Sequence, residues 1–192
     1  MHDTDLFPVF LRLQGRKVVV VGGGKVAAAK LSGLVATGAR LTVVAPDVTP
    51  EITGTPGVVV VMRGFVPSDL DGAWFVIAAA TPDVNRAVAI VAEERQIFVN
   101  AVDDRHHASA YTGGVFRRGG VTITVSTEGQ APALAGLLRE ALEAVVPEEI
   151  ETWVLAARTL RQQQRVDGVA MANRRPLLLQ ALNRLYEEKV SA

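Results

Sequence analysis

The sequence predicts an α/β fold built on a doubly wound parallel sheet, and three observations carry that prediction. Residues 18–21 are four consecutive valines, a pattern typical of a strand that is buried on both faces. Three glycines, Gly22–Gly24, follow at once and lead into a segment with helical spacing of its apolar residues. Further apolar runs then alternate with helix-length segments, which is the pattern of a Rossmann-like sheet.

The elements of this sheet follow a short apolar lead, Leu6–Leu11, which we expect to pack against the sheet edge. The predicted strands are 17–21, 40–45, 58–62, 74–80 and 97–102, and helices are expected after the first glycine turn and over 83–94. Right-handed crossovers would bring the carboxyl ends of the strands to one edge, where ligands bind in such sheets.

The pattern changes after residue 104. Two glycine pairs, Gly113–Gly114 and Gly119–Gly120, predict that 105–120 is irregular. Alternating β-branched residues over 121–125 indicate a strand. Helices are expected at 132–146, 148–166 and 176–190, of which the first and last would begin at a proline. Because this tail cannot continue a doubly wound sheet, we predict a small helical lobe at the C-terminal end.

The glycine turn has the spacing of a dinucleotide-binding motif. Gly22, Gly24 and Ala27 follow the pattern G-x-G-x-x-G/A, in which Gly22 permits a tight turn, Gly24 lets the backbone approach a pyrophosphate, and Ala27 lets helix and strand pack closely. The pyrophosphate would lie at the helix N-terminus, where backbone N–H groups have no partner inside the helix. The alternative is a turn that only lets the helix fold back on the sheet.

Two more strand ends would face the same crevice. Asp47 lies about 20 residues beyond the glycines, where an acid bonds the ribose of the dinucleotide. It is equally an ordinary turn residue after Pro46. No arginine follows this strand to pair with a 2′-phosphate, which favours NAD over NADP. A small side chain at Ala80 or Thr81 would leave room for the cofactor, although Thr81 also suits a helix N-cap.

Candidate chemistry follows the fifth predicted strand. Asn100, Asp103 and Asp104 would face the cofactor crevice, and a carboxylate there can act as a general base or orient a substrate nitrogen. The alternative is a solvated turn, since aspartate is common at strand ends. Adjacent histidines on an extended chain point opposite ways, so we expect no metal site at His106 and His107.

Composition limits the class of protein. The 192 residues include 49% hydrophobic and 21% charged residues, with 20 Asp and Glu balancing 20 Lys and Arg. We therefore expect no nucleic-acid or membrane partner. The absence of cysteine excludes disulfides, thiolate nucleophiles and Fe–S clusters. The first residues lack the pattern of a signal peptide, so we expect a cytoplasmic protein.

Seven short segments occur in an order that resembles one known family. They are Gly22–Ala27, Gly38–Val43, Ala79–Thr81 with Asn85, Asn100–Asp104, Arg117–Gly119, Ser126–Thr127 and Pro132–Ala135. Over about 6–150 the chain resembles the precorrin-2 dehydrogenase and sirohydrochlorin ferrochelatase family, the N-terminal module of siroheme synthase. The resemblance implies NAD-dependent oxidation of precorrin-2 to sirohydrochlorin, with ferrous insertion in some members.

The resemblance also implies roles for individual residues. Lys25, Val26, Pro46 and Asp47 match positions that contact the cofactor, and Asp103 matches the acid implicated in dehydrogenation and chelation. The residues expected to contact the polycarboxylated tetrapyrrole are Asn100, Asp104, Arg117, Arg118, Ser126 and Thr127. From the residues alone, the arginine pair is either a hairpin tip in solvent or a carboxylate-binding site.

The family further implies an intertwined homodimer formed through about 113–146. We accordingly divide the chain into an NAD-binding Rossmann domain at 1–112, a dimerisation segment of strand plus helix at 113–146, and a helical lobe at 147–192. One departure concerns the loop Glu128–Ala131, where relatives often carry Gly-Gly-Lys-Ser, so that a cation is lost and an acid gained.

Two other functions compete with this one. A dimeric NAD-binding regulatory module without turnover would tolerate the lost cation. A short-chain dehydrogenase would need Tyr-x-x-x-Lys, and neither Tyr111 nor Tyr186 has a lysine four residues on. The predicted function is therefore precorrin-2 dehydrogenation, with the regulatory module as the alternative.

Overall fold

The computed structural model describes residues 6–190. These residues form two compact units, and the division falls between Thr112 and Gly113. Among the described residues, no helix combines the length and apolar character that a membrane crossing requires.

The first unit contains a five-stranded sheet with the strand order β3-β2-β1-β4-β5. Its strands are β1 (Lys17–Val21), β2 (Arg40–Ala45), β3 (Val58–Met62), β4 (Ala73–Ala78) and β5 (Phe98–Ala101). Every neighbouring pair is parallel. The strand order reverses between β1 and β4, which confirms the predicted doubly wound sheet and puts its ligand crevice outside the carboxyl ends of these two strands.

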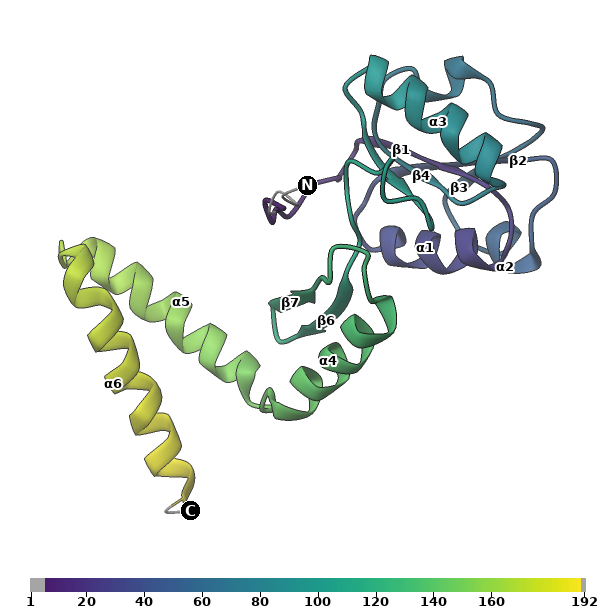
Figure 1. The fold of residues 1–192 in the computed structure, drawn as a ribbon. Coiled ribbons are helices and arrows are strands. Elements are labelled where there is room, and N and C mark those ends of the chain that lie inside the picture. Colours follow the sequence, from purple (N-terminus) through teal and green to yellow (C-terminus); the bar gives the residue numbers. More distant parts are fainter. Residues whose placement is uncertain (1–5, 191–192) are drawn as a thin grey trace. The chain divides into compact units, whose positions relative to one another are not determined.

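Helices cover both faces of this sheet (Figure 1). The helices α1 (Lys25–Val35) and α2 (Pro50–Thr53) lie on one face and α3 (Pro82–Glu94) lies on the other, while the 3-10 turn η1 (Pro67–Leu70) leads into β4. Val18 and Val20 of β1 pack in the same cluster as Leu31 of α1. Val19 and Val21 pack with α3 residues such as Val88. The valine run is thus buried on both faces, as the sequence predicts.

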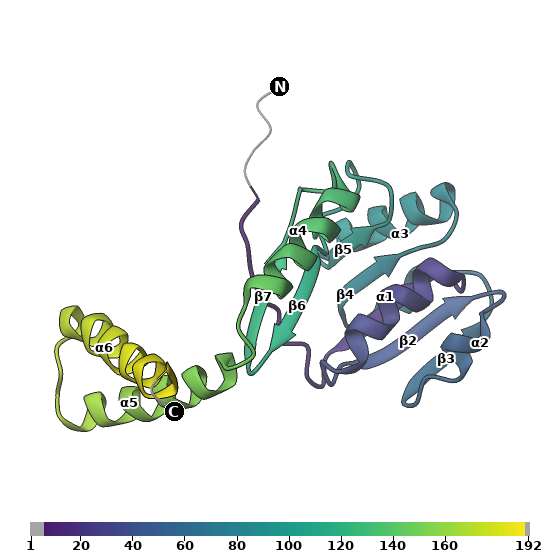
Figure 2. The ribbon, with the colours of Figure 1, turned by 90° about the horizontal axis from the view of Figure 1, so that it is seen from below.

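The second unit combines a hairpin with three helices (Figure 2). The strands β6 (Gly114–Arg118) and β7 (Val121–Val125) pair antiparallel, and α4 (Pro132–Val145) packs against both. The helices α5 (Ile150–Val166) and α6 (Met171–Val190) lie against each other, and α5 also contacts β7.

The prediction that 105–120 is irregular is wrong for its last part. Residues 114–118 form β6, and Gly119 and Gly120 are the turn of the hairpin, with φ of +53° and +80°. A two-residue turn with positive φ at both positions matches the right-handed twist of its flanking strands. The strand was missed because its pairing with β7 is a tertiary contact, whereas the glycines alone suggest a loop.

Two further expectations are corrected. The last helix begins at Met171 rather than Pro176, so the proline lies inside the helix, where it removes one backbone hydrogen bond. Contacts in the preceding turn support the earlier start: the side-chain Nε of Arg174 donates to the Val169 carbonyl at 3.0 Å. The lead Leu6–Leu11 does not pack against the sheet edge, because its apolar side chains are exposed and Phe7 is 87% exposed.

Candidate functional site

The three glycines after β1 have different surroundings. At Gly22, φ is +125° and a Cβ would lie 2.2 Å from the Ala79 carbonyl oxygen. At Gly23, a Cβ would lie 1.8 Å from the Asp47 carbonyl oxygen. At Gly24, a Cβ would meet nothing within 4 Å. The first two glycines therefore allow neighbouring loops to approach closely, and the third leaves space open in front of α1.

The start of α1 carries free hydrogen-bond donors. Gly24 occupies the N-cap position and supplies no side-chain cap, so the first N–H groups of the helix have no intrahelical partner. Ala27 is fully buried and lets the helix lie close to the sheet. Open space beside unpaired N–H groups at a helix N-terminus fits a pyrophosphate. The residues present thus suit the phosphate part of a dinucleotide.

A cleft of about 300 Å³ adjoins this turn within the first unit. It is lined by Val26 from α1, Ala79 and Ala80 beyond β4, Pro82 and Asn85 from α3, and residues 102–104 beyond β5. The cleft therefore lies at the carboxyl ends of β4 and β5, next to the point where the strand order reverses. Of the predicted site residues, it brings together Val26, Asp103 and Asp104.

Asp103 stands at the rim of this cleft in an unusual backbone conformation. Its φ is +58°, the left-handed region that few residues other than glycine adopt, and its side chain is exposed. Such strain at a cleft is typical of functional positions. A carboxylate in this place is free to accept a proton from a bound molecule.

Lys30 is a neighbour of Asp103 that the sequence analysis missed. It lies on α1 one turn after Val26, is half-buried, and donates a hydrogen bond from Nζ to the Thr112 hydroxyl. Burial lowers the pKa of the Lys30 ammonium, and the negative charge of Asp103 opposes that shift. The i, i+4 spacing from Val26 is the signal that could have placed this lysine beside the cleft.

Asp104 is tied to a histidine. Its Oδ2 lies 2.7 Å from the His107 Nδ1, and its Oδ1 accepts a hydrogen bond from the His107 backbone N–H at 3.2 Å. Partial burial would raise the pKa of the Asp104 carboxyl, but these hydrogen bonds outweigh it and hold the pKa below its usual value. The pair closes the turn after β5, so Asp104 shapes the loop that presents Asp103.

Two buried asparagines fix the strand ends around the cleft. Asn85 accepts a hydrogen bond from the Ala80 N–H at 2.8 Å, whereas the Thr81 side chain caps no N–H of α3. Asn100 is 6% exposed and donates from Nδ2 to the Ala110 carbonyl at 2.9 Å. Within the described part of the chain its Oδ1 has no hydrogen-bond partner. Asn100 therefore holds the loop over β5.

Asp47 reaches the glycine turn with its backbone. Pro46 and Asp47 are exposed after β2, and the Asp47 carbonyl oxygen faces Gly23. The loop is held by a hydrogen bond from the Thr49 N–H to the Gly23 carbonyl at 2.8 Å. Neither Asp47 nor Lys25 lines the cleft itself, although both flank the turn.

The remaining predicted residues belong to the second unit. Arg118 lies over the Phe116 ring, 4.9 Å from its centroid, and donates to the Val146 carbonyl, whereas Arg117 is exposed. Ser126 and Thr127 accept hydrogen bonds through their hydroxyls from the N–H groups of residues 128 and 131, at 3.1 and 3.2 Å. These hydroxyls hold the turn that leads into α4.

No group of three or more metal-binding side chains occurs among the residues that the structure describes.

Comparison with known proteins identifies the family. Residues 9–114 match a family model described as NAD(P)-binding, and residues 118–144 match the model of the central part of sirohaem biosynthesis proteins. This chain belongs to the NAD(P)-binding family of sirohaem biosynthesis proteins. The match confirms the predicted dinucleotide cofactor and the family resemblance.

Named relatives agree with this assignment. The chain is 38% identical over 175 residues to siroheme synthase 3 of Aeromonas hydrophila and 39% identical over 183 residues to the siroheme synthase of Photorhabdus laumondii. These alignments cover 89% and 93% of this chain but only 37% and 39% of the relatives. A solved structure titled SirC, precorrin-2 dehydrogenase, superimposes with a TM-score of 0.71 at 27% identity, over 91% of this chain and 88% of that one.

Proposed function

We propose that this protein oxidises precorrin-2 to sirohydrochlorin with NAD as the acceptor. One observation carries the proposal: a strained, exposed Asp103 lies in the cleft beside an open glycine turn, in a fold shared along most of its length with a protein titled precorrin-2 dehydrogenase. The curated relatives are more than twice as long as this chain, so their full activities are not transferred to it.

Different residues bind the cofactor and take up the proton. NAD, when bound, supplies the hydride acceptor, so dehydrogenation leaves the protein to bind, orient and take up a proton. The Gly24 turn and the N–H groups of α1 hold the pyrophosphate. Asp103 accepts the proton that the macrocycle releases as the hydride leaves. Lys30 lies near this carboxylate, and the negative charge of Asp103 opposes the lowering of the Lys30 pKa by burial.

The decisive assay is anaerobic incubation with precorrin-2 and NAD, followed by NADH absorbance and the product spectrum. We expect NADH from the natural chain, a loss of turnover of about 100-fold or more in Asp103→Ala, and nearly unchanged NAD affinity. Asp83→Ala is the matched control, since Asp83 is an exposed carboxylate on α3 that does not line the cleft.

Tight NAD binding without any NADH would refute the dehydrogenase and support the alternative, a regulatory module. Full turnover in Asp103→Ala would remove its assigned role. Repeating the assay with sirohydrochlorin and ferrous or cobalt ion tests whether a metal ion is a second substrate.

We further infer a homodimer formed through the second unit. The helix α4 exposes Leu134, Leu137 and Leu138 at 48%, 63% and 44%, a large apolar face for one amphipathic helix. A second copy of the hairpin and α4 would cover it.

The test of this homodimer is sedimentation of a variant. Leu137→Asp should shift the protein to monomer, and Glu140→Asp is the exposed control. A monomeric natural chain would contradict the inference. A cytoplasmic location remains a prediction.

A further inference from the structure

The helical pair α5–α6 is strongly basic in a chain of zero net charge. Residues 150–190 contain six arginines, one lysine and four acids, a balance of +3 that the rest of the chain offsets. Positive charge concentrated on one surface produces a stronger local electrostatic potential than the same charge scattered over the molecule. Such a potential attracts anionic ligands. The balance of charges over the whole chain conceals this local excess of positive charge.

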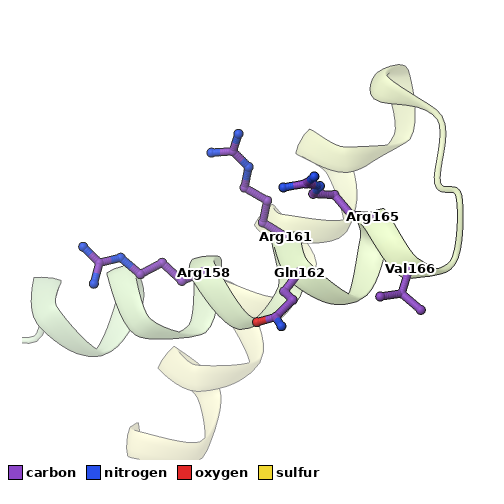
Figure 3. Close-up of a pocket in the computed structure, with 5 residues that line it drawn as sticks. All are labelled: Arg158, Arg161, Gln162, Arg165 and Val166. Atoms are coloured by element: carbon purple, nitrogen blue, oxygen red, sulfur yellow. The ribbon is translucent and has the colours of Figure 1, made fainter.

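Three of these arginines lie on one side of α5 (Figure 3). Arg158, Arg161 and Arg165 line a groove of about 590 Å³ together with Gln162 and Val166. Their spacing of three and four residues brings consecutive side chains to one helix face, and the row extends roughly 10 Å along the axis. The groove thus presents a row of guanidinium groups, an amide and an apolar side chain.

No described carboxylate forms an ion pair with these three arginines. The nearest acid in sequence, Asp167, instead accepts hydrogen bonds from Gln163 Nε2 at 3.0 and 3.1 Å. Glu151 lies at the opposite end of α5, where its backbone packs against Gly119. Like charges at i, i+4 on a helix repel one another and destabilise the helix. An anion that bridges Arg161 and Arg165 would reduce this repulsion.

The helix α5, which carries the arginine row, is held in place near both ends of the groove. Gln164 is 5% exposed and anchors α5 to α6 through a hydrogen bond from Nε2 to the Arg174 carbonyl at 3.4 Å. At the other end, Arg158 Nη2 lies 3.4 Å from the position that a Cβ would take at Gly120, in the hairpin turn. Contacts at both ends therefore hold the helix that carries the arginine row, which lowers the ordering cost of binding.

We propose that this groove binds the carboxylate side chains of a polycarboxylated tetrapyrrole. The proposal rests on the proposed function for the identity of that ligand. A guanidinium presents paired donors that match a carboxylate, and a ligand with several carboxylates around one ring can engage several arginines at once. Phosphates of a nucleic acid are the competing ligands, but a duplex requires no apolar contact of the kind Val166 offers.

The test measures binding of an octacarboxylate porphyrin to the full chain by its absorbance change. Arg161→Gln with Arg165→Gln should weaken binding about tenfold or more, equivalent to 1.4 kcal/mol, and reduce its salt dependence. Arg175→Gln with Arg184→Gln is the matched control, since it removes the same charge from α6 outside the groove. It should change affinity less than about twofold. Circular dichroism verifies that both variants fold.

Equal affinity in the two double variants would overturn the proposal. So would binding of a DNA duplex that depends on Arg161 and Arg165 while the porphyrin is not bound. Failure of the proposed function is seen separately, as absence of NADH from the natural chain with porphyrin binding intact.

Discussion

Two glycine-to-alanine substitutions in the turn after β1 distinguish a glycine that packing requires from a glycine that cofactor binding requires. Gly23→Ala places a Cβ 1.8 Å from the Asp47 carbonyl oxygen and 2.9 Å from the Val48 Cα. Both are backbone atoms, so no side chain can rotate away to relieve the contact. The loop after β2 must shift by about 1 Å or more to reach ordinary packing distances, which breaks the hydrogen bond from Thr49 to Gly23.

The expected loss of stability in Gly23→Ala is the sum of the overpacking and the lost hydrogen bond. Overpacking costs about 1–3 kcal/mol, and loss of the hydrogen bond costs about 0.5–1.5 kcal/mol. We therefore expect Gly23→Ala to lower the free energy of unfolding by about 2–4 kcal/mol. Gly24→Ala differs, because φ is −83° and a Cβ there meets open space. Its stability should change by no more than about 1 kcal/mol, while its methyl group fills the space assigned to the pyrophosphate.

Urea unfolding and NAD titration of the two variants check this reasoning. Gly23→Ala should unfold at lower urea, and Gly24→Ala should fold normally but bind NAD about tenfold or more weakly, a loss of at least 1.4 kcal/mol. An unchanged unfolding midpoint for Gly23→Ala would refute the packing argument. Unchanged NAD affinity in a folded Gly24→Ala would refute the assignment of the pyrophosphate to this turn.

Three further predictions concern stability. Leu31→Ala, at a fully buried α1 position, should cost about 2–5 kcal/mol in urea unfolding. The Arg63 hydrogen bond holds the pKa of Asp69 below its usual value, so Asp69→Asn should lower the unfolding midpoint at pH 7; the difference should shrink as the pH falls below about 4, and a constant difference would contradict the pairing. Because burial lowers the pKa of Lys30, the natural chain should gain stability as the pH rises toward about 10.4, and Lys30→Met should lack that gain.

Tertiary contacts explain where sequence-based prediction failed. Pairing with β7 makes 114–118 a strand although glycines flank it on both sides. Contacts of the α5–α6 turn let the last helix begin before Pro176. The close approach of the Asp47 backbone makes Gly23 necessary, yet Gly23 occupies a variable position of the motif. Local propensity does not predict the β6 strand, the start of α6 or the need for Gly23. Each depends on a contact with a residue that lies outside the local sequence pattern.

The sequence by itself determined the sheet, its cofactor turn and the family. A run of valines can be buried only between two layers, and the glycine spacing after it is short and local, so neither depends on the rest of the chain. Only the tertiary structure decided which polar residues face the cleft. It separated Asp103, strained and exposed, from Asp104, which is engaged by His107, and it added Lys30. Side-chain direction and partners at a strand end depend on how distant segments pack, and a linear pattern of polar residues does not encode that.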